Sequence, residues 1–348
     1  MVVTGITPTW RILANQADIT ATIARRFVSL SLTDESGMES DVLEITLYDA
    51  DPSAPIQIPP TGAELELFLG YDGIERRMGM FVCDEVELAG WPGEMVIRAR
   101  AAVYDKSKGG KTDLQTQKTR SWPKGTKLGD MVAKIAKEHG LTPAVATSLA
   151  SIALPHIDQA DESDINLLVR LAKRYDAIVK PATGKLVLAK RGESKTTGGE
   201  SIPRVTLAPG DCASWRMTLS KRETAGMVVA YWHAVKQAKR NEVKVGSGEP
   251  VRRIKQYYPT QEMALAAARA DLQRRQRGMK TVSLTVVGHP SYVAEAPLTL
   301  AGFRPGVDGE WLISRVTHRV DAGAGYVCDV EGEIPNSGSD EAVEVVQS

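Results

Sequence analysis

Three acidic residues gather around a serine near the middle of the chain, in the stretch Asp161-Glu162-Ser163-Asp164. Such carboxylates can bind a metal ion or transfer protons, but a zinc-type site also needs histidine or cysteine, and neither occurs between positions 159 and 188. Apolar residues that include Leu168 follow at helical spacing. We therefore interpret the stretch as the start of a helix, with Asp161 or Ser163 as its N-cap, and expect no metal site there.

Three other patterns could indicate a chemical site, and each lacks a feature that such a site needs. The run Gly110-Lys111-Thr112 ends like a phosphate-binding loop, but Asp105 stands where that loop needs glycine. The five histidines are scattered without the spacing of metal ligands. The cysteines lie far apart in strand-like runs, which indicates buried thiols rather than a disulfide framework or a zinc site: Cys83, Cys212 and Cys328. No paired catalytic carboxylate or nucleophile motif stands out, so we expect no enzymatic activity and no cofactor.

The composition is that of a globular protein with balanced charge. Its 348 residues include 43 Lys plus Arg and 43 Asp plus Glu, so no overall field attracts nucleic acid or anionic lipid. The basic run at 269–278 shares its predicted helix with Glu262 and Asp271, and we interpret it as a solvated face. The sequence shows neither a secretion signal nor a long apolar run, so we expect synthesis in the cytoplasm and no stable membrane insertion.

Changes of pattern along the chain predict its domains. Alternating apolar and polar residues indicate a small antiparallel β domain at 1–104 and a second β domain at 201–335. A helix at 260–277 interrupts the second domain. Between the two, 105–200 mixes helical and strand-like patterns and is predicted to be an α+β domain. Residues 336–348 are expected to form a flexible acidic tail.

A short repeat relates the two β domains. Each contains a strand that ends near a glycine and an aromatic residue, followed by a second strand of pattern Gly-x-aromatic-apolar-x-x-x-Val. The matching positions are Gly79, Phe81 and Val86 in the first domain and Gly309, Trp311 and Val316 in the second. Because hairpins converge easily, chance is the alternative explanation. If the repeat is real, Phe81 and Trp311 should occupy equivalent core positions.

The segment 123–141 resembles the lysin motif, a sugar-binding module whose first helix follows a Gly-Thr-Leu-like turn. This resemblance would imply binding to cell-wall peptidoglycan through the region from Thr126 to Gly140. The same segment is equally explained as a helix start followed by an apolar stripe, which needs no glycan. Peptidoglycan binding is therefore kept as the alternative function.

Several segments in order resemble the phage late control gene D proteins, which are tail hub proteins of contractile phages related to the first half of type VI secretion spike proteins. The opening stretch at 10–49 is similar to the start of that family. Its central and C-terminal motifs are matched here by Glu162, Ser163, Asp164, Leu168, Gly184, Gly309, Trp311 and Tyr326. One departure follows Tyr175, where the family often has glycine and this chain has Asp176.

This resemblance implies a mainly β fold, in which two related antiparallel β-barrel domains flank the mixed helix and hairpin domain. It also implies a homotrimeric ring between the hexameric tail tube and the trimeric spike, in which three chains with two barrels each make six. The expected partners are other copies of the chain, the tail spike protein, the tail tube and other baseplate proteins, with no specific nucleic acid. The expected location is the baseplate of a virion tail or tail-like particle.

Overall fold

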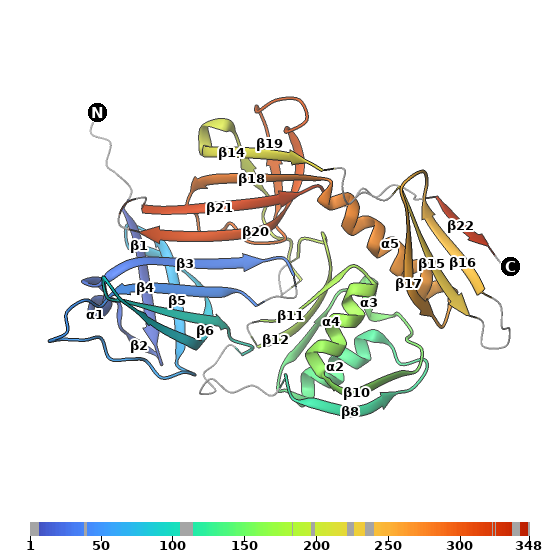
Figure 1. The fold of residues 1–348 in the computed structure, drawn as a ribbon, viewed down its shortest axis with the longest axis horizontal. Helices are drawn as coiled ribbons and strands as arrows, with labels where there is room; N and C mark the ends of the chain where they lie inside the picture. The colour runs from blue at the N-terminus through green and yellow to red at the C-terminus, as the bar shows by residue number, and fades with distance from the viewer. Residues whose placement is uncertain are drawn as a thin grey trace.

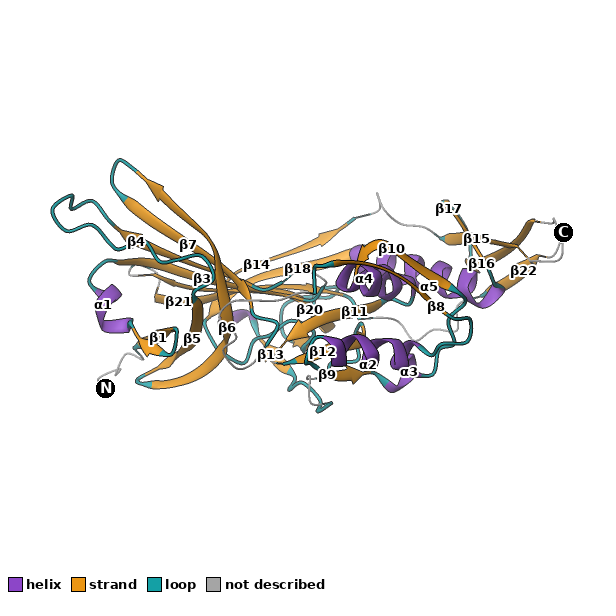
Figure 2. Cartoon of the chain, turned by 90° about the horizontal axis from the view of Figure 1, so that it is seen from below, coloured by secondary structure: helices purple, strands orange, loops and turns teal. Residues whose placement is uncertain are grey.

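Strands make up most of the molecule, as Figures 1 and 2 show, and the predicted fold class, mainly β with an α+β insertion, is confirmed. The computed structural model describes residues 7–37, 40–104, 114–182, 184–195, 199–220, 226–233, 240–321, 323, 325–335 and 342–346. The run Gly110-Lys111-Thr112 lies outside these residues. Within them, no helix is both long enough and apolar enough to cross a membrane.

The first β block forms from the alternating pattern near the N-terminus. In β4 the residues Leu43, Ile45 and Leu47 are buried, as a period of two requires of a sheet with one covered face. The elements of this block are β1 (Pro8–Ala14), β2 (Ala17–Asp18), α1 (Thr20–Ala24), β3 (Phe27–Glu35), β4 (Val42–Tyr48), β5 (Glu64–Tyr71), β6 (Ile74–Ala89) and β7 (Glu94–Ala101). Hairpin β6–β7 is long and projects from the sheet in Figure 2.

The second β block is built in the same way from the C-terminal part of the chain. Its elements are β13 (Val205–Leu207), the 3-10 turn Pro209–Asp211, β14 (Cys212–Leu219), β18 (Lys280–Val287), β19 (Pro297–Leu300), β20 (Gly309–Asp321) and β21 (Gly325–Glu333). Val282, Leu284 and Val286 alternate towards the core from β18. Strand β14, in contrast, is exposed at most of its positions.

The two β blocks form one sheet, because β3 pairs antiparallel with the second half of β20. The described strands follow the order β14-β18-β21-β20-β3-β4-β7-β6-β5-β1-β2, and β13 and β19 attach beside β20. One apolar core extends under both blocks and includes Leu30 and Leu32 of β3 with Val316 and Val320 of β20. This joint could not be predicted from the sequence, because the local pattern of a strand does not identify a distant partner.

The middle unit has a separate core formed by helices packed on short strands. Its elements are β8 (Gln117–Trp122), α2 (Leu128–Glu138), β9 (Thr142–Val145), α3 (Thr147–Ala150), β10 (Ile157–Ser163), α4 (Asp164–Arg174), β11 (Ala177–Ala182) and β12 (Lys185–Lys190). The apolar residues at helical spacing in α2 are buried in this core, as predicted. In α4 the buried apolar residues are Leu167, Leu168, Leu171 and Ala172, whereas Ile165 and Val169, which share the predicted spacing with Leu168, are only partly buried.

A third unit contains a small sheet covered by the longest helix. Its elements are β15 (Met227–His233), β16 (Arg240–Gly246), β17 (Val251–Tyr258), α5 (Gln261–Gly278) and β22 (Val343–Val346). The sequence pattern predicts that a helix alone interrupts the second β block, whereas strands β15, β16 and β17 also lie outside the large sheet. Residues 343–346, expected in a flexible tail, pair with β16, because three of the four are valine, which favours strands.

Two aromatic residues mark the large core. Phe81 and Trp311 are each 2% exposed, and the indole Nε1 of Trp311 donates a hydrogen bond to the carbonyl oxygen of Val307 at 2.9 Å. Both side chains belong to the cluster shared by the two β blocks. Their burial makes them strong contributors to the stability of the sheet.

We expect Trp311→Ala to lower the free energy of unfolding by about 3–5 kcal/mol, because it removes a buried indole and leaves a cavity. Phe81→Ala should have a similar effect. The matched control is Ile74→Ala at a side chain that is 83% exposed, which should change stability by less than about 0.5 kcal/mol. Urea unfolding followed by tryptophan fluorescence or circular dichroism measures all three, and a Trp311 variant as stable as the control would contradict the assigned core position.

Candidate functional site

The acidic stretch lies where β10 ends and α4 begins. Ser163 is the N-cap of α4 and accepts a hydrogen bond from the backbone N–H of Asn166 at 3.3 Å, so the predicted helix start is confirmed. Glu162 pairs with Arg170, one side-chain distance being 2.7 Å, at a partly exposed position. Asp164 has a different environment, because its side chain points into the middle unit and is fully buried.

Asp164 is the buried centre of a cluster of charged and polar groups, in which Lys118 and Arg120 are partly exposed. One carboxylate oxygen accepts from Lys118 Nζ at 2.7 Å and lies 2.8 Å from His139 Nε2. The other accepts from Arg120 at 2.5 Å and from Gln159 Nε2 at 2.8 Å. Burial by itself would raise the pKa of Asp164, but these hydrogen bonds and the charge of Arg120 lower its pKa to about 2. The cluster therefore connects β8, β10, α2 and α4 through one carboxylate.

Part of this cluster has the composition of a metal site. Glu138, His139 and Asp164 place one ligand atom each within 4.8 Å of one another. The ammonium group of Lys118, however, lies 2.7 Å from Asp164 and 3.2 Å from Glu138. This lysine already supplies the positive charge that a metal ion would bring, so the geometry favours a structural ion cluster. Sequence reasoning missed it because Lys118, Arg120 and His139 lie in other segments of the chain.

The two glycines of the repeat occupy matching places. Gly79 on β6 faces Leu67 on β5, and Gly309 on β20 faces Leu300 on β19. Their φ angles are 155° and 133°, in the region that favours glycine. Two residues further on, the core aromatic side chains Phe81 and Trp311 face Leu65 and Leu298 in turn.

The strands that follow these glycines also share their irregularities. The pairing of β6 with β7 shifts register between Cys83 and Glu85, and that of β20 with β21 shifts between Ile313 and Arg315. Both shifts lie at the same offset from the preceding glycine. Beyond them, Val86 is half-buried and Val316 is fully buried against the common core. The strands thus bend at equivalent positions.

Two further motif residues lie in the middle unit. Leu168 is fully buried on α4, and Gly184 has a φ of 74° in the turn between β11 and β12. The segment that resembles a lysin motif forms α2, and its apolar stripe is buried in the core of the unit: Leu128, Met131, Val132, Ile135 and Ala136. That face therefore has an intramolecular partner, and the geometry gives no support to sugar binding through it.

Tyr326 forms a buried polar contact at the joint of the two β blocks. Its hydroxyl lies 2.8 Å from Nδ1 of His318, whose Nε2 lies 3.0 Å from the carbonyl oxygen of Tyr292. Because a carbonyl only accepts, Nε2 carries the proton and Nδ1 accepts from the tyrosine hydroxyl. Burial lowers the pKa of His318 to about 4 and raises the pKa of Tyr326. His318 is thus a fully buried residue of strand β20.

Ion pairs hold the three units together, and sequence reasoning missed them as well. Arg277 of α5 is 1% exposed and donates two hydrogen bonds of 2.6 Å to Asp176. Its Nε lies 3.2 Å from Glu333 of β21. Lys180 of β11 reaches Asp41 beside β4 at 2.5 Å. The basic run interpreted as a solvated face therefore contains a buried residue that links all three units. The acids that pair with Arg277 lie far from it in the sequence, so the basic run alone gave no sign of its burial.

Asp176 stands where the related family often has glycine. Its φ is 50°, in the left-handed region that glycine adopts freely and aspartate tolerates better than most residues. The turn after α4 therefore forms with aspartate at this position, and the carboxylate contacts Arg277 as described above. This explains how the chain keeps the turn without glycine.

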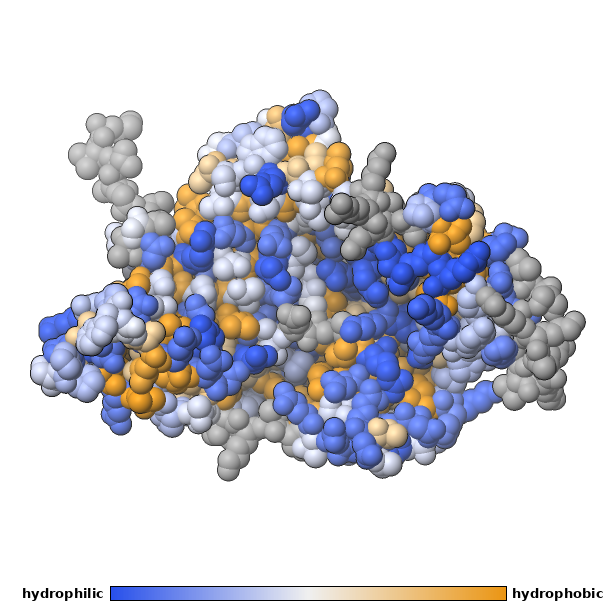
Figure 3. Space-filling model, in the orientation of Figure 1, coloured by the Kyte–Doolittle hydropathy of each residue, from blue (hydrophilic) through white to orange (hydrophobic). Residues whose placement is uncertain are grey.

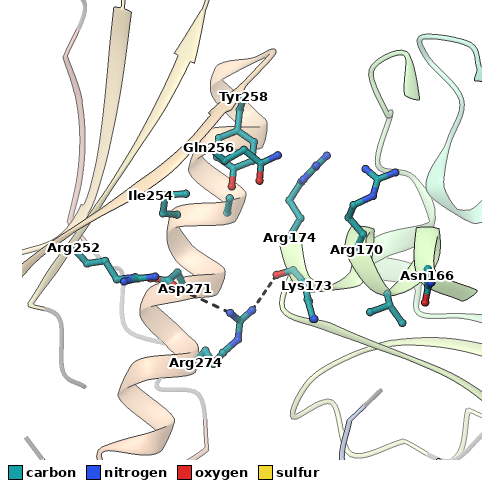
Figure 4. A pocket seen from close by; sticks show the side chains of 12 residues that line it. Asn166, Arg170, Lys173, Arg174, Arg252, Ile254, Gln256, Tyr258, Asp271 and Arg274 are labelled. Atoms are coloured by element: carbon teal, nitrogen blue, oxygen red, sulfur yellow. Dashed lines mark hydrogen bonds and ion pairs between the residues drawn. The ribbon is translucent and has the colours of Figure 1, made fainter. Parts of the chain in front are cut away.

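A basic groove of about 490 Å³ lies between α4 and α5 (Figure 4). Arginines and a lysine line both sides, and Figure 3 shows a strongly hydrophilic surface in this region. Asp271 lies 2.8 Å from Arg252 and 4.0 Å from Arg274, which also donates to the carbonyl oxygen of Lys173 at 3.1 Å. The groove joins two units through polar contacts, and its described lining contains no histidine, cysteine or serine that could serve as a nucleophile or base.

We expect Asp164→Asn to lower the free energy of unfolding by about 1.5–3 kcal/mol, because it removes the buried negative charge that accepts hydrogen bonds from the partly exposed Lys118 and Arg120. Glu162→Gln, two residues earlier, removes a partly exposed ion pair and should cost less than about 1 kcal/mol. Urea unfolding at pH 7 compares the two variants. Equal losses would show that the cluster around Asp164 contributes no more than a surface pair.

Comparison with known proteins agrees with this architecture. The family model for the phage tail baseplate hub (GPD) matches residues 44–324. A probable baseplate hub protein of Escherichia phage 186 is 31% identical over 95% of this chain and 94% of its own length. The 43 kDa tail protein of prophage MuSo2 from Shewanella oneidensis has the same fold, with a TM-score of 0.70 at 16% identity over 94% of this chain and 98% of that one.

A more distant structure extends the comparison beyond phages. The E. coli c3393 protein, described as a component of the type VI secretion system with structural similarity to the T4 tail proteins gp27 and gp5, has a TM-score of 0.52 at 12% identity. The matched region includes 90% of this chain and 74% of the c3393 chain. The family match and the identity to the phage 186 protein extend over most of the sequence. The chain therefore belongs to the phage tail baseplate hub (GPD) family.

Proposed function

We propose that the chain forms a homotrimeric ring that adapts the hexameric tail tube to the trimeric spike. The observation that carries this proposal is the correspondence between hairpins β5–β6 and β19–β20, with a left-handed glycine, a core aromatic residue and a register shift at the same offsets. Two related β units per chain give six in a trimer. Such a ring meets a sixfold tube on one face and a threefold spike on the other.

The proposed partners are copies of the chain, the tail spike protein, the tail tube and other baseplate proteins. Membership in the hub family supports a place among tail components, and the likeness in fold to a type VI secretion component that resembles gp27 and gp5 is consistent with it. The location is the baseplate of a virion tail or tail-like particle, after synthesis in the host cytoplasm. The role is structural, since the clusters described above connect units of the protein rather than surround a substrate.

The middle and third units have a supporting role in this proposal. They are tied to the large sheet by Lys180 and Arg277, which pair with Asp41, Asp176 and Glu333. Because these contacts join charged groups over short distances, they fix orientation as well as position. The sheet of the two β blocks would face the tube axis, and the other units would pack outside it.

We expect light scattering of the purified chain to give three times the 37.7 kDa mass of one chain, either alone or after mixing with the spike protein. The physical reason is that a closed ring satisfies all equivalent interfaces at once. A mixture with an unrelated trimeric protein of similar size serves as the control. A chain that stays monomeric in both samples, and does not bind the spike, would contradict the adapter role.

A further inference from the structure

We propose that the free edge of β6 binds β14 of a second copy of the chain, in the register in which β20 binds β3 within one chain. This inference rests on the proposed homotrimer and names the surface that forms it. The surface on one copy is Glu85–Trp91, the last part of β6 with the start of its turn, and on the other copy it is Ser214–Ser220, the end of β14. The partner is therefore identical in sequence.

The order of strands repeats within the large sheet. Strands β14, β18, β21, β20 and β19 follow one another in the second block as β3, β4, β7, β6 and β5 do in the first. Strand β14 thus corresponds to β3, and β20 corresponds to β6. Within one chain β20 pairs with β3. The equivalent contact, β6 with β14, is missing from the described pairs of a single chain, since both strands lie at opposite parts of the sheet.

The pairing registers identify equivalent residues across the two blocks. In the first block, a row of directly paired residues crosses strands β3, β4, β7 and β6 in that order: Leu30, Ile45, Ile97 and Val86. In the second block the same path runs through Trp215, Leu284, Val330 and Val316. The first strand of each path also shifts register at the same place, between Phe27 and Ser29 in β3 and between Cys212 and Ser214 in β14.

These equivalences predict each contact between copies. Inside one chain, β20 faces β3 through the pairs His318 with Leu32, Arg319 with Ser31 and Val320 with Leu30. The equivalent pairs between copies are Leu88 with Met217, Ala89 with Arg216 and Gly90 with Trp215. Arg216 would also lie diagonal to Glu87, which places opposite charges near each other on the polar face.

Exposure of the two edges supports a missing partner. His318 and Leu30 are 0% and 1% exposed in the joint within the chain, whereas their equivalents Leu88 and Trp215 are 54% and 42% exposed. Trp91 at the end of the β6 edge is 88% exposed, and Leu219 near the end of β14 is 71% exposed. Large apolar side chains on unpaired strand edges favour association with another strand, and the second copy offers the complementary edge.

Disulfide cross-linking tests the register directly. In a Cys212→Ser background, Ala89→Cys combined with Arg216→Cys places two thiols on facing positions of neighbouring copies. The matched control is Arg319→Cys with Ser31→Cys, the equivalent pair within one chain. A second control, Ala89→Cys with Thr218→Cys, keeps the same face but moves one thiol by two residues, beyond the reach of a disulfide. Each variant is oxidised mildly, alone and with the spike protein, and is measured by non-reducing gel and light scattering.

We expect Ala89→Cys with Arg216→Cys to yield covalent dimers and trimers, at least tenfold more than the Thr218 control, while Arg319→Cys with Ser31→Cys closes within a single chain. Trimers by light scattering without cross-links at positions 89 and 216 would overturn this pairing and leave the trimeric adapter intact. Cross-links in the Thr218 control instead would overturn the register. Monomers in every sample, with or without spike, would overturn the pairing together with the adapter function.

Discussion

Backbone pairing between β3 and β20 decides the form of the large sheet, because it joins strands from the two ends of the chain. Without it, each block would have an open edge and its own smaller core. With it, Leu30 and Val320 lie in a single apolar cluster that stabilises both blocks. The hydroxyls of Thr33 and Thr317 lie 3.4 Å apart across the joint, and Arg315 pairs with Glu35 at 2.7 Å. In this member of the baseplate hub family, the continuous sheet holds the two β blocks in a fixed relation to each other.

Ion pairs and separate apolar cores characterise the other two units. Each has its own hydrophobic cluster, and the described ion pairs between units include Arg277 with Asp176, Lys180 with Asp41 and Arg191 with Glu333. Such contacts are stable only if geometry is well defined, because desolvation of each charge is costly. Basic and acidic residues are equal in number over the whole chain, but at the contacts between units a basic residue of one unit pairs with an acidic residue of another.

Local features of the fold could be predicted from sequence, and long-range ones could not. The helix start at Ser163 followed from a cap residue and an apolar stripe, and the strands around Leu43 followed from alternation. The burial of Arg277 and the cluster at Asp164 were missed, because their partners lie far away in the chain and a basic run alone looks solvated. The departure of β15 from the large sheet was missed for a related reason: an apolar strand does not specify which sheet it joins. The repeat around Gly79 and Gly309 was visible in sequence, although only the registers show how far it extends.

The shared register shifts after Gly79 and Gly309 have a geometric consequence. A bulge bends its strand, so β6 and β20 bend at equivalent positions in the two blocks. A bend that repeats along a sheet turns the sheet in the same direction at each repeat. A substitution that removed one of these bulges would therefore change the bend of one block and leave the bend of the other block as it is.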